Sequence, residues 1–362
     1  MNAKVNCGAL SSAVRLVSRG VANNSTIPIM GHICMNIDSE RGIIEFVGGD
    51  TEIEIRSIVP CQVDESVKVT VPSKKISDFS GSWNQESTIN IKIESNDTKF
   101  QCQRSRVSFA GYDYEDYPFF RNEEMHFLTK ISAQELRENL QKVAWGVAVG
   151  DTRVFLNGVL FAVDDGILSL VASNGSMLVG IGIEVETDQS VSAVISGRSV
   201  KIINEFLASA DAVEILKSPN SLCFKTALSV LYLKLMDVSY YDYKKVIFDD
   251  SDFKVKCKST EFASVLNRSC LFVDKKLYPS CKFELIDDVI SIRTVDENQK
   301  SSNECLDVKV KSKGTIASKY NPKYLLNIAK HSGDELSIEL SDKARGMKIV
   351  SDNYYAIVAP MN

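Results

Sequence analysis

The sequence predicts an α+β protein made of three copies of one domain, and each copy divides into two similar halves. The main observation is a repeat of about 122 residues, in which VTVPSKKISDFSGSW, VSAVISGRSVKIINEFLAS and GTIASKYNPKYLLNIAKHS begin at Val69, Val191 and Gly314. Each segment reads as a strand, a polar capping position and an amphipathic helix. A unit of this length is about the size of a small domain. We therefore expect domains at residues 1–122, 126–246 and 248–362.

Each repeat is expected to contain two strand–helix–strand–strand–strand halves. In the first repeat a helix at residues 10–20 precedes the strands GHICMNI, GIIEFV and TEIEIRSIV, and the strand VKVTV then starts a second half with a helix at 73–83. Equivalent helices are predicted at 132–146, 197–210, 259–271 and 318–331. Strands such as TINIKIES alternate apolar and polar residues, which is typical of half-buried antiparallel strands. Acidic, aromatic linkers, DYEDYPFFRNEE and SYYDYKKVIFDDSD, separate the repeats.

Composition excludes several classes of protein. The 362 residues are 44% hydrophobic and 25% charged, as in ordinary globular proteins. No apolar run approaches the roughly 18–20 residues that span a bilayer, and the first residues show no signal peptide. Nine scattered cysteines without a C-x-x-C pair are typical of reduced thiols. We therefore expect a cytoplasmic protein without membrane contact.

Catalysis and metal binding have little support in the sequence. The three histidines, His32, His126 and His331, are far apart and lack the spacing of metal ligands. No G-x-x-x-x-G-K-[ST], G-x-S-x-G or H-E-x-x-H motif occurs. We therefore expect no enzymatic activity, no metal and no cofactor.

Charge is distributed unevenly along the chain. The net charge is −5, which taken alone disfavours nucleic-acid binding. The six predicted helices nevertheless contain twelve Lys or Arg and five Asp or Glu, a net charge of +7 that leaves −12 for the rest of the chain. If all six helices face one side, that side is basic and the sheet side is acidic.

Five stretches fall in the order and at the separations of one known family. They are STIPIMGHICMNI from Ser25, RSRVSFAG from Arg104, DTRVFLNGVLF from Asp151, LSLVASNGSMLVG from Leu168 and the end YAIVAPMN. Through them the chain resembles, over essentially its whole length, the beta subunit of the bacterial replicative DNA polymerase, the processivity sliding clamp. The resemblance implies three clamp domains per chain and a head-to-tail homodimeric ring, with helices inside and antiparallel sheets outside.

The resemblance also implies what the ring does. It would encircle duplex DNA without sequence preference and confer processivity without catalysis of its own. The implied protein partners are the replicative polymerase catalytic subunit, the clamp loader and other clamp-binding proteins. A protein-binding scaffold that never encircles DNA stays open as an alternative.

Three sets of functional residues follow from the resemblance. The DNA-binding set, on the inner helices, is Arg15, Arg19, Lys74, Lys75, Lys142, Arg153, Arg198, Lys201, Lys319 and Lys323. The dimer interface set is Val107 and Phe109 on an edge strand, opposite Leu271 and Phe272 at the end of a helix. The set around a hydrophobic partner-peptide cleft, between the second and third domains, is Leu156, Ser173, Gly175, Ser176, Met177, Leu178, Tyr241, Lys245, Val246, Ala344, Gly346, Ile357, Ala359, Pro360 and Met361.

The sequence departs from the family pattern in this cleft. Ser176 and Met177 replace a His-Arg pair, and Tyr241 replaces a proline. We therefore expect an apolar pocket whose rim has lost a cation. Asn23 and Asn24 replace a basic residue before Ser25, so one inner DNA contact is expected to be weaker.

Overall fold

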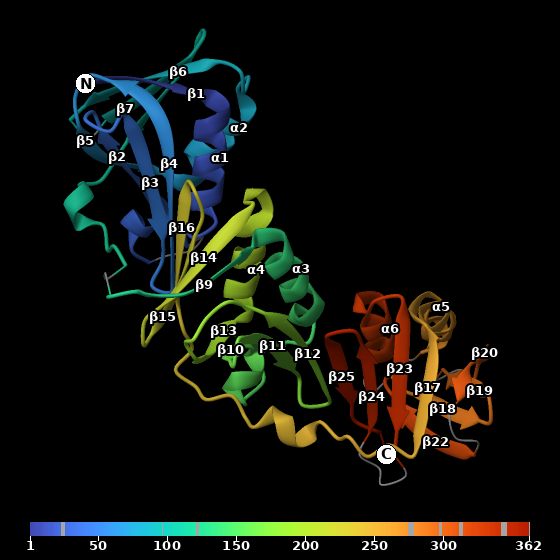
Figure 1. Ribbon diagram of the computed structural model, residues 1–362. Coiled ribbons are helices and arrows are strands. Elements are labelled where there is room, and N and C mark those ends of the chain that lie inside the picture. Colours follow the sequence, from blue (N-terminus) through green and yellow to red (C-terminus); the bar gives the residue numbers. More distant parts are fainter. Residues whose placement is uncertain are drawn as a thin grey trace. The chain divides into compact units, whose positions relative to one another are not determined.

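The computed structural model describes residues 1–22, 26–95, 97–120, 123–273, 279–296, 299–310, 314–341 and 346–361. The chain forms two compact units (Figure 1). Unit 1 consists of Met1–Arg137 and Arg198–Leu235, and unit 2 of Glu138–Gly197 and Met236–Asn362. The second sequence repeat therefore contributes to both units. Asn23, Asn24 and Ala344 lie outside the described residues.

Six α-helices in the described residues lie close to the predicted positions. They are α1 (Cys7–Ser18), α2 (Ser73–Ser82), α3 (Ala133–Ala144), α4 (Gly197–Phe206), α5 (Ser259–Ser269) and α6 (Pro322–His331). Cys7, Leu10, Val14 and Val17 of α1 recur every three or four positions and are fully buried. The helix begins where the Asn6 side chain accepts a hydrogen bond from the Ala9 amide at 2.9 Å.

The predicted start of the last helix, at residue 318, is wrong. Asn321 caps α6 by accepting a hydrogen bond from the Lys323 amide. Pro322 occupies the first turn, where a backbone N–H would have no partner within the helix, so the lack of an N–H in proline costs nothing. The three residues Ser318, Lys319 and Tyr320 belong to a strand instead. Because Lys319 lies on that strand, the prediction that Lys319 is a helix residue is also wrong.

Each half of each repeat has the predicted strand–helix–strand–strand–strand order. The first repeat contains β1 (Asn2–Asn6), β2 (His32–Asp38), β3 (Ile43–Gly49), β4 (Ile53–Val63), β5 (Val67–Pro72), β6 (Thr88–Glu94), β7 (Asp97–Cys102) and β8 (Ser105–Ala110). The second contains β9 (His126–Ser132), β10 (Gly158–Asp164), β11 (Ile167–Ser173), β12 (Met177–Glu184), β13 (Val191–Ser196), β14 (Ala212–Lys217), β15 (Ser221–Lys225) and β16 (Ser229–Lys234). The third contains β17 (Phe253–Lys258), β18 (Cys281–Ile286), β19 (Val289–Val295), β20 (Ser301–Asp307), β21 (Lys309–Val310), β22 (Thr315–Tyr320), β23 (Glu335–Leu340), β24 (Met347–Ser351) and β25 (Tyr354–Val358).

The two halves of every repeat exchange their first strands. In the first repeat β1 pairs with β6 of the second half, and β5 pairs with β2 of the first half. The same exchange joins β9 to β14 and β13 to β10, and then β17 to β23 and β22 to β18. Neither half can complete its sheet alone, because an unpaired strand edge leaves backbone groups without partners. Because of this exchange, the strands of both halves are needed to form the sheets of a repeat.

Sheets also continue from one repeat to the next. In unit 1, β4 of the first repeat pairs with β16 of the second, from Ile53–Leu233 to Ser57–Ser229. In unit 2, β12 of the second repeat pairs with β25 of the third. Among the described strands, β8 ends the sheet of unit 1 and β20 ends the four-stranded sheet of unit 2.

Helices cover one face of these sheets (Figure 1). In unit 1, α1 packs on α2 and on strands β3 and β4, and in unit 2, α5 packs on α6 and β20. Among the described residues, none of the helices has the length and apolar character needed to cross a membrane.

One buried carboxylate connects the first sheet to the linker that follows it. The Glu54 side chain is 2% exposed, and its Oε1 accepts from the Arg56 guanidinium at 2.7–2.8 Å. Its other oxygen accepts from the Phe120 amide at 2.7 Å. A buried carboxylate without such partners is costly, so these contacts fix the linker on the sheet.

We predict that Glu54→Ala lowers the free energy of unfolding of unit 1 by about 2–4 kcal/mol, because it leaves a half-buried guanidinium and a backbone N–H unpaired. Urea unfolding followed by far-UV circular dichroism measures the change in the free energy of unfolding. The matched control is Glu94→Ala, whose carboxylate pairs with Lys92 and Lys99 but is 48% exposed, and which should leave the stability nearly unchanged. Equal effects of the two substitutions would contradict the role given to Glu54.

Candidate functional site

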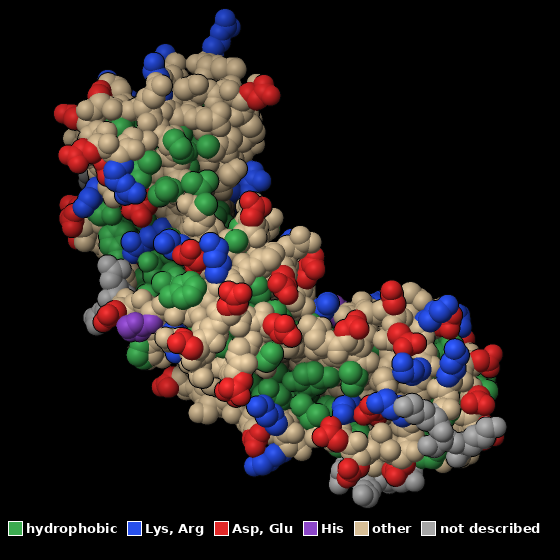
Figure 2. All heavy atoms as spheres, in the orientation of Figure 1, with side chains coloured by type: hydrophobic (Ala, Val, Ile, Leu, Met, Phe, Trp, Pro, Cys, Tyr) green, Lys and Arg blue, Asp and Glu red, His purple; other side chains and the backbone are tan. Residues whose placement is uncertain are grey.

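A cavity of about 380 Å³ opens on the surface of unit 2. It is lined by Arg153, Phe155, Leu156, Ser173, Gly175, Ser176, Met177, Leu178, Tyr241, Val246 and Ile357. Figure 2 shows apolar side chains gathered over β12 and beside the linker that precedes β17. The structure thus brings together nine residues of the cleft predicted from the sequence.

Two β-strands form the floor of the cavity, and aromatic side chains form its wall. Leu178 on β12 and Ile357 on β25 are directly paired, and both are buried. The wall is formed by Phe155, whose ring centre lies 5.6 Å from that of Tyr241. Tyr240 stacks on Tyr241 at 5.2 Å and continues this wall. Apolar walls of this kind suit an apolar side chain better than a charged one.

The rim is a tight turn between β11 and β12. Ser173 Oγ donates to the Met177 carbonyl at 2.7 Å, and Asn174 Oδ1 accepts from the Ser176 and Met177 amides. Gly175 has φ +84°, a left-handed conformation that favours glycine. Met177 is 3% exposed, so its side chain points inward and adds no polar group to the rim.

A cation nevertheless stands at this rim. Arg153 precedes the short 3-10 helix η3 (Val154–Asn157), and its guanidinium lies over Gly175 so closely that a Cβ there would overlap it. Its Nε and Nη2 donate to the Asp151 carboxylate at 3.0 and 2.9 Å, and these bonds lower the pKa of Asp151 to about 2. The prediction that Arg153 lies on an inner helix is therefore wrong, and the rim keeps one cation despite Met177.

Sequence reasoning missed Arg153 and Phe155 as cleft residues. Both lie in the stretch DTRVFLNGVLF, next to the predicted cleft residue Leu156. Their place in the chain beside Leu156 is the one hint that the sequence offers for either residue.

The C-terminal tail runs beside the cavity but does not line it. The Ala359 amide donates to the Ser176 carbonyl at 2.9 Å, and the Met361 amide donates to the Lys319 carbonyl at 2.8 Å. Pro360, between them, is half-buried. These bonds hold the tail in an extended conformation against β22.

Two further predicted cleft residues lie near the cavity without lining it. Lys245 pairs with Asp242 at 3.2 Å, and its side chain is 81% exposed. Gly346 is buried, with φ +102°, and lies against the Val358 carbonyl.

The helices are less basic than the sequence predicted. With the observed bounds they contain ten Lys or Arg and five Asp or Glu, a net charge of +5, because Arg19 and Lys319 fall outside them. Two cations are neutralised within unit 1, since Arg19 pairs with Glu205, and Arg198 pairs with Asp50 at 2.6 Å. The exposed helix cations of the predicted set are Arg15, Lys74, Lys75, Arg198, Lys201 and Lys323, and Lys142 is half-buried.

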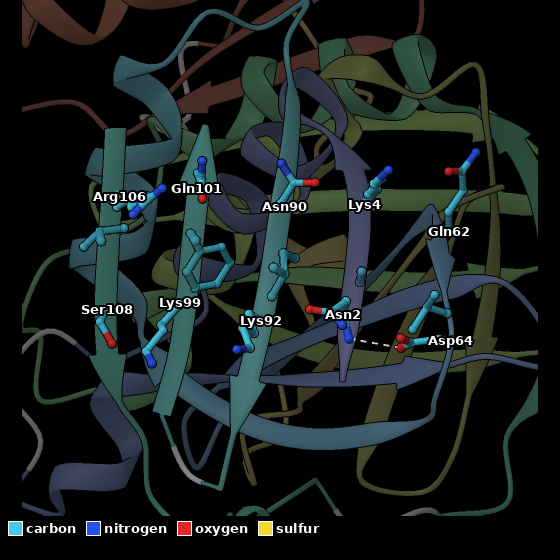
Figure 3. A pocket seen from close by; sticks show the side chains of 15 residues that line it. Asn2, Lys4, Gln62, Asp64, Asn90, Lys92, Lys99, Gln101, Arg106 and Ser108 are labelled. Carbon is cyan, nitrogen blue, oxygen red and sulfur yellow. Dashed lines mark hydrogen bonds between the residues drawn. The ribbon is translucent and has the colours of Figure 1, made fainter. Parts of the chain in front are cut away.

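One sheet face of unit 1 is locally basic, which the expectation of an acidic sheet side did not include. A shallow hollow of about 950 Å³ crosses strands β4, β1, β6, β7 and β8 (Figure 3). Four cations, Lys4, Lys92, Lys99 and Arg106, point into it from four strands, alongside a single carboxylate, Asp64. Glu94 beside the hollow pairs with two of these lysines.

The four predicted interface residues lie at the two sheet ends. On the edge strand β8, Val107 is half-buried, while Phe109 packs inside unit 1 with ring centres 6.0 Å from Phe79 and from Phe100. In unit 2, the short helix η6 (Cys270–Phe272) presents Leu271, which is 79% exposed. Leu271 is therefore an apolar side chain without a covering surface among the described residues.

Two family models match the chain. One, described as DNA polymerase III beta subunit, N-terminal domain, matches residues 1–121, and the other, described as the central domain of the same subunit, matches residues 130–242. Similar known proteins include the beta sliding clamp of Chlamydia pneumoniae, 24% identical over 348 residues, with 92% of this chain and 91% of that protein covered. The beta sliding clamp of Vibrio cholerae is 22% identical, with 92% and 91% covered.

Solved structures agree with the fold. The DNA polymerase III subunit beta of Pseudomonas aeruginosa superposes with a TM-score of 0.94 at 22% identity, and each chain is covered completely. The DNA polymerase sliding clamp of Bacillus subtilis superposes with a TM-score of 0.93 at 20% identity, covering 100% of this chain and 99% of that one. The predicted α+β repeat fold is confirmed by these matches.

We predict that Gly175→Ala pushes the Arg153 guanidinium off the turn. The pKa of Asp151 should then rise from about 2 toward its ordinary value of roughly 3.9, because its hydrogen-bond donors move away. Carboxyl NMR titration measures this pKa. The control is Gly150→Ala, which has a similar φ of +68° but open space around its Cβ, and which should leave the pKa of Asp151 low. A low pKa in both variants would contradict the contact.

Proposed function

The chain belongs to the family of bacterial DNA polymerase III beta subunits, the beta sliding clamps. From this premise we propose which of its surfaces bind DNA, a second copy and partner proteins. The protein is a non-catalytic polymerase subunit that confers processivity. Membership of the family implies DNA and a polymerase as partners. The proposals below concern the domain limits, the closure of the ring, the DNA-facing residues and the partner cleft.

We propose that the chain closes into a ring with a second copy through its two sheet ends. The supporting observation is the pairing rule inside the chain. The last strand of a first half pairs with the last strand of the next repeat's second half, as β4 does with β16 and β12 does with β25. β20, the last strand of the third repeat's first half, pairs with β19 on one side and has no partner on the other among the described strands. By the same rule the matching strand is β8 of another copy.

This contact is head-to-tail, so it must either close or extend into filaments. We propose that each chain has domains at residues 1–122, 126–246 and 248–362. Two such chains would form a closed ring that contains twelve helices. Helices packed about 8–10 Å apart give a circumference of roughly 100–120 Å and a diameter of about 35 Å between opposite helix axes. Subtracting a helix diameter of about 10 Å leaves an opening of about 25 Å, wide enough for duplex DNA and a layer of water. A closed ring keeps the DNA inside by its topology, so the individual contacts between protein and DNA can be weak.

We propose that the exposed helix cations attract DNA without reading its sequence, since Lys and Arg contacts to phosphates carry no base information. Arg15, Lys74, Lys75, Lys201 and Lys323 are the main candidates because they are exposed and on helices. Arg198 and Arg19 contribute less, because each already pairs with a carboxylate.

We propose that the unit 2 cavity captures a short apolar segment of the polymerase, of the clamp loader or of other clamp-binding proteins. The single observation that carries this proposal is the cavity itself, an open apolar space of about 380 Å³ beside a held C-terminal tail. Leu178, Val246 and Ile357 supply the apolar contacts, and the Arg153–Asp151 pair supplies a polar anchor at the rim. Buried apolar anchors are expected to dominate the affinity.

We predict that the pair Leu271→Ala and Phe272→Ala converts the homodimer to monomer. Removing two apolar anchors from an interface should raise the dimer dissociation constant by about 30-fold or more. Sedimentation equilibrium measures the constant. Leu228→Ala, which removes a similarly exposed leucine (58%) from unit 1, is the control and should leave the dimer intact. An unchanged dimer in the double variant would refute the assigned interface.

We predict that Lys201→Gln reduces the salt dependence of DNA binding more than Arg198→Gln does. The two residues are three positions apart on α4, but the Arg198 charge is already paired with Asp50. Loss of one phosphate contact reduces the slope of log K against log salt by about 0.9. Binding to linear and to nicked circular duplexes over a salt series measures both slopes. Selective binding of particular base sequences would instead contradict DNA encirclement.

A further inference from the structure

The shallow hollow of unit 1, which we call the basic hollow, has no part in the function proposed above. Its polar side chains stand in two rows across five neighbouring strands (Figure 3). The first row is Arg106, Gln101, Asn90, Lys4 and Gln62. The second row is Ser108, Lys99, Lys92, Asn2 and Asp64. Strand register fixes this order, because successive residues of the first row are cross-strand partners, as are those of the second row from Ser108 to Asn2.

The first row holds two cations without a counter-charge. Arg106 and Lys4 are exposed, and neither has a carboxylate partner among the described residues. The amide side chains of Gln101 and Asn90 stand between them. Amide groups both donate and accept hydrogen bonds, as a peptide backbone does. This row can therefore hold a polar chain that carries negative charge.

The second row is partly neutralised by the chain itself. Lys92 and Lys99 share the Glu94 carboxylate, with one N–O distance of 2.6 Å from each lysine. Glu94 pairs with Asp97 at the end of the β6–β7 hairpin, outside both rows. At the other end of the row, Asp64 accepts from the Asn2 amide at 3.0 Å. The carboxylates thus border the basic hollow, and its centre attracts anions.

The spacing of the cations matches an extended peptide that crosses the strands. Neighbouring strands lie about 4.8 Å apart, so the three steps from β8 to β1 separate Arg106 from Lys4 by about 14 Å. Residues i and i+4 of an extended chain are also about 14 Å apart, with side chains on one side. Residue i+2 then lies between β7 and β6, which carry Lys99 and Lys92. Acidic residues at i, i+2 and i+4 would meet all four cations.

A peptide fits this surface better than a nucleic acid strand does. Proteins that bind single strands stack the bases on exposed aromatic side chains. Phe100 is the aromatic residue in the lining of the basic hollow, and it is fully buried. The surface thus offers charges and amides without a stacking platform.

The basic hollow stays open in the proposed ring. Side chains of β8 alternate between the two sheet faces, so Arg106 and Ser108 project away from the face where Phe109 is buried. A second copy that joins β8 would use the backbone groups of its edge. Pairing at this edge leaves the face of the sheet uncovered.

We propose that the basic hollow docks an extended acidic segment of a partner protein, with a carboxylate at every second residue. Arg106 and Lys4 hold the outer two carboxylates, and the amides between them bind the backbone of the segment. The middle carboxylate competes with Glu94 for Lys92 and Lys99. This inference depends neither on ring closure nor on the unit 2 cavity.

Two fluorescein-labelled peptides of one composition test the spacing. Gly-Glu-Ser-Glu-Ser-Glu-Gly carries glutamates at i, i+2 and i+4, whereas Gly-Ser-Glu-Glu-Glu-Ser-Gly carries them in a run. Fluorescence anisotropy with the full-length chain at low salt measures both dissociation constants. The alternating peptide should bind about 5-fold more tightly, because the middle glutamate of the run points away from the sheet and its outer two span only half the distance.

Three substitutions test the residues. Arg106→Gln and Lys4→Gln should each weaken binding of the alternating peptide by about 2- to 5-fold, the range for exposed charge pairs. Glu94→Gln should strengthen it by a similar factor, a gain that a misfolded chain would not give. The control is Lys234→Gln, which removes an exposed lysine at the end of β16, outside the lining, and should change nothing.

Three results would overturn the proposal. Equal affinities for the two peptides would mean that the sheet attracts acidic chains without docking them. Equal effects of Arg106→Gln and Lys234→Gln would place the peptide elsewhere. Tighter binding of a seven-nucleotide oligothymidine than of the alternating peptide would make the basic hollow a nucleic-acid surface instead.

Discussion

The structure depends on one constraint, that the backbone groups along every strand edge need partners. Each repeat satisfies it by exchanging first strands between its halves, as β1 and β5 do. Successive repeats satisfy it by joining last strands, as β4 and β16 do. An exposed long edge is a site for pairing with another chain, and β8 and β20 are two of the strands at sheet ends. We propose that a second copy pairs them with the same geometry that the chain already uses twice.

The same construction positions the functional surfaces. Strand pairing between repeats places one linker and one tight turn beside each junction in the described residues. In unit 2 the linker residues Tyr241 and Val246 line the cavity, whereas in unit 1 the linker residue Tyr117 is buried and its hydroxyl accepts from the Gly49 amide. The two junctions therefore share their strand pairing and differ in the side chains of the linker.

The order of helices and strands could be predicted from the sequence because the repeat shows each pattern several times. Helix boundaries were less accessible. Residues SKY read as the start of a helix, but they end a strand that pairs with β18, and only the Asn321–Pro322 cap marks where α6 begins. The helix charge was overestimated for the same reason, because Arg19 and Lys319 lie outside the observed helices. The pairing of Arg198 with Asp50 is a separate matter, since it arises through folding and no local pattern predicts it. Most of the cleft followed from the family resemblance, whereas Arg153 entered it because Gly175 leaves room for the guanidinium.

Hydrogen exchange of the two edge strands tests the central claim, that β8 and β20 of different copies complete one sheet. Exchange at residues 105–110 and 301–307 should be slow at concentrations where the dimer forms, and should accelerate together in both segments on dilution to monomer. Rapid exchange in both segments of an intact dimer would contradict closure through these strands.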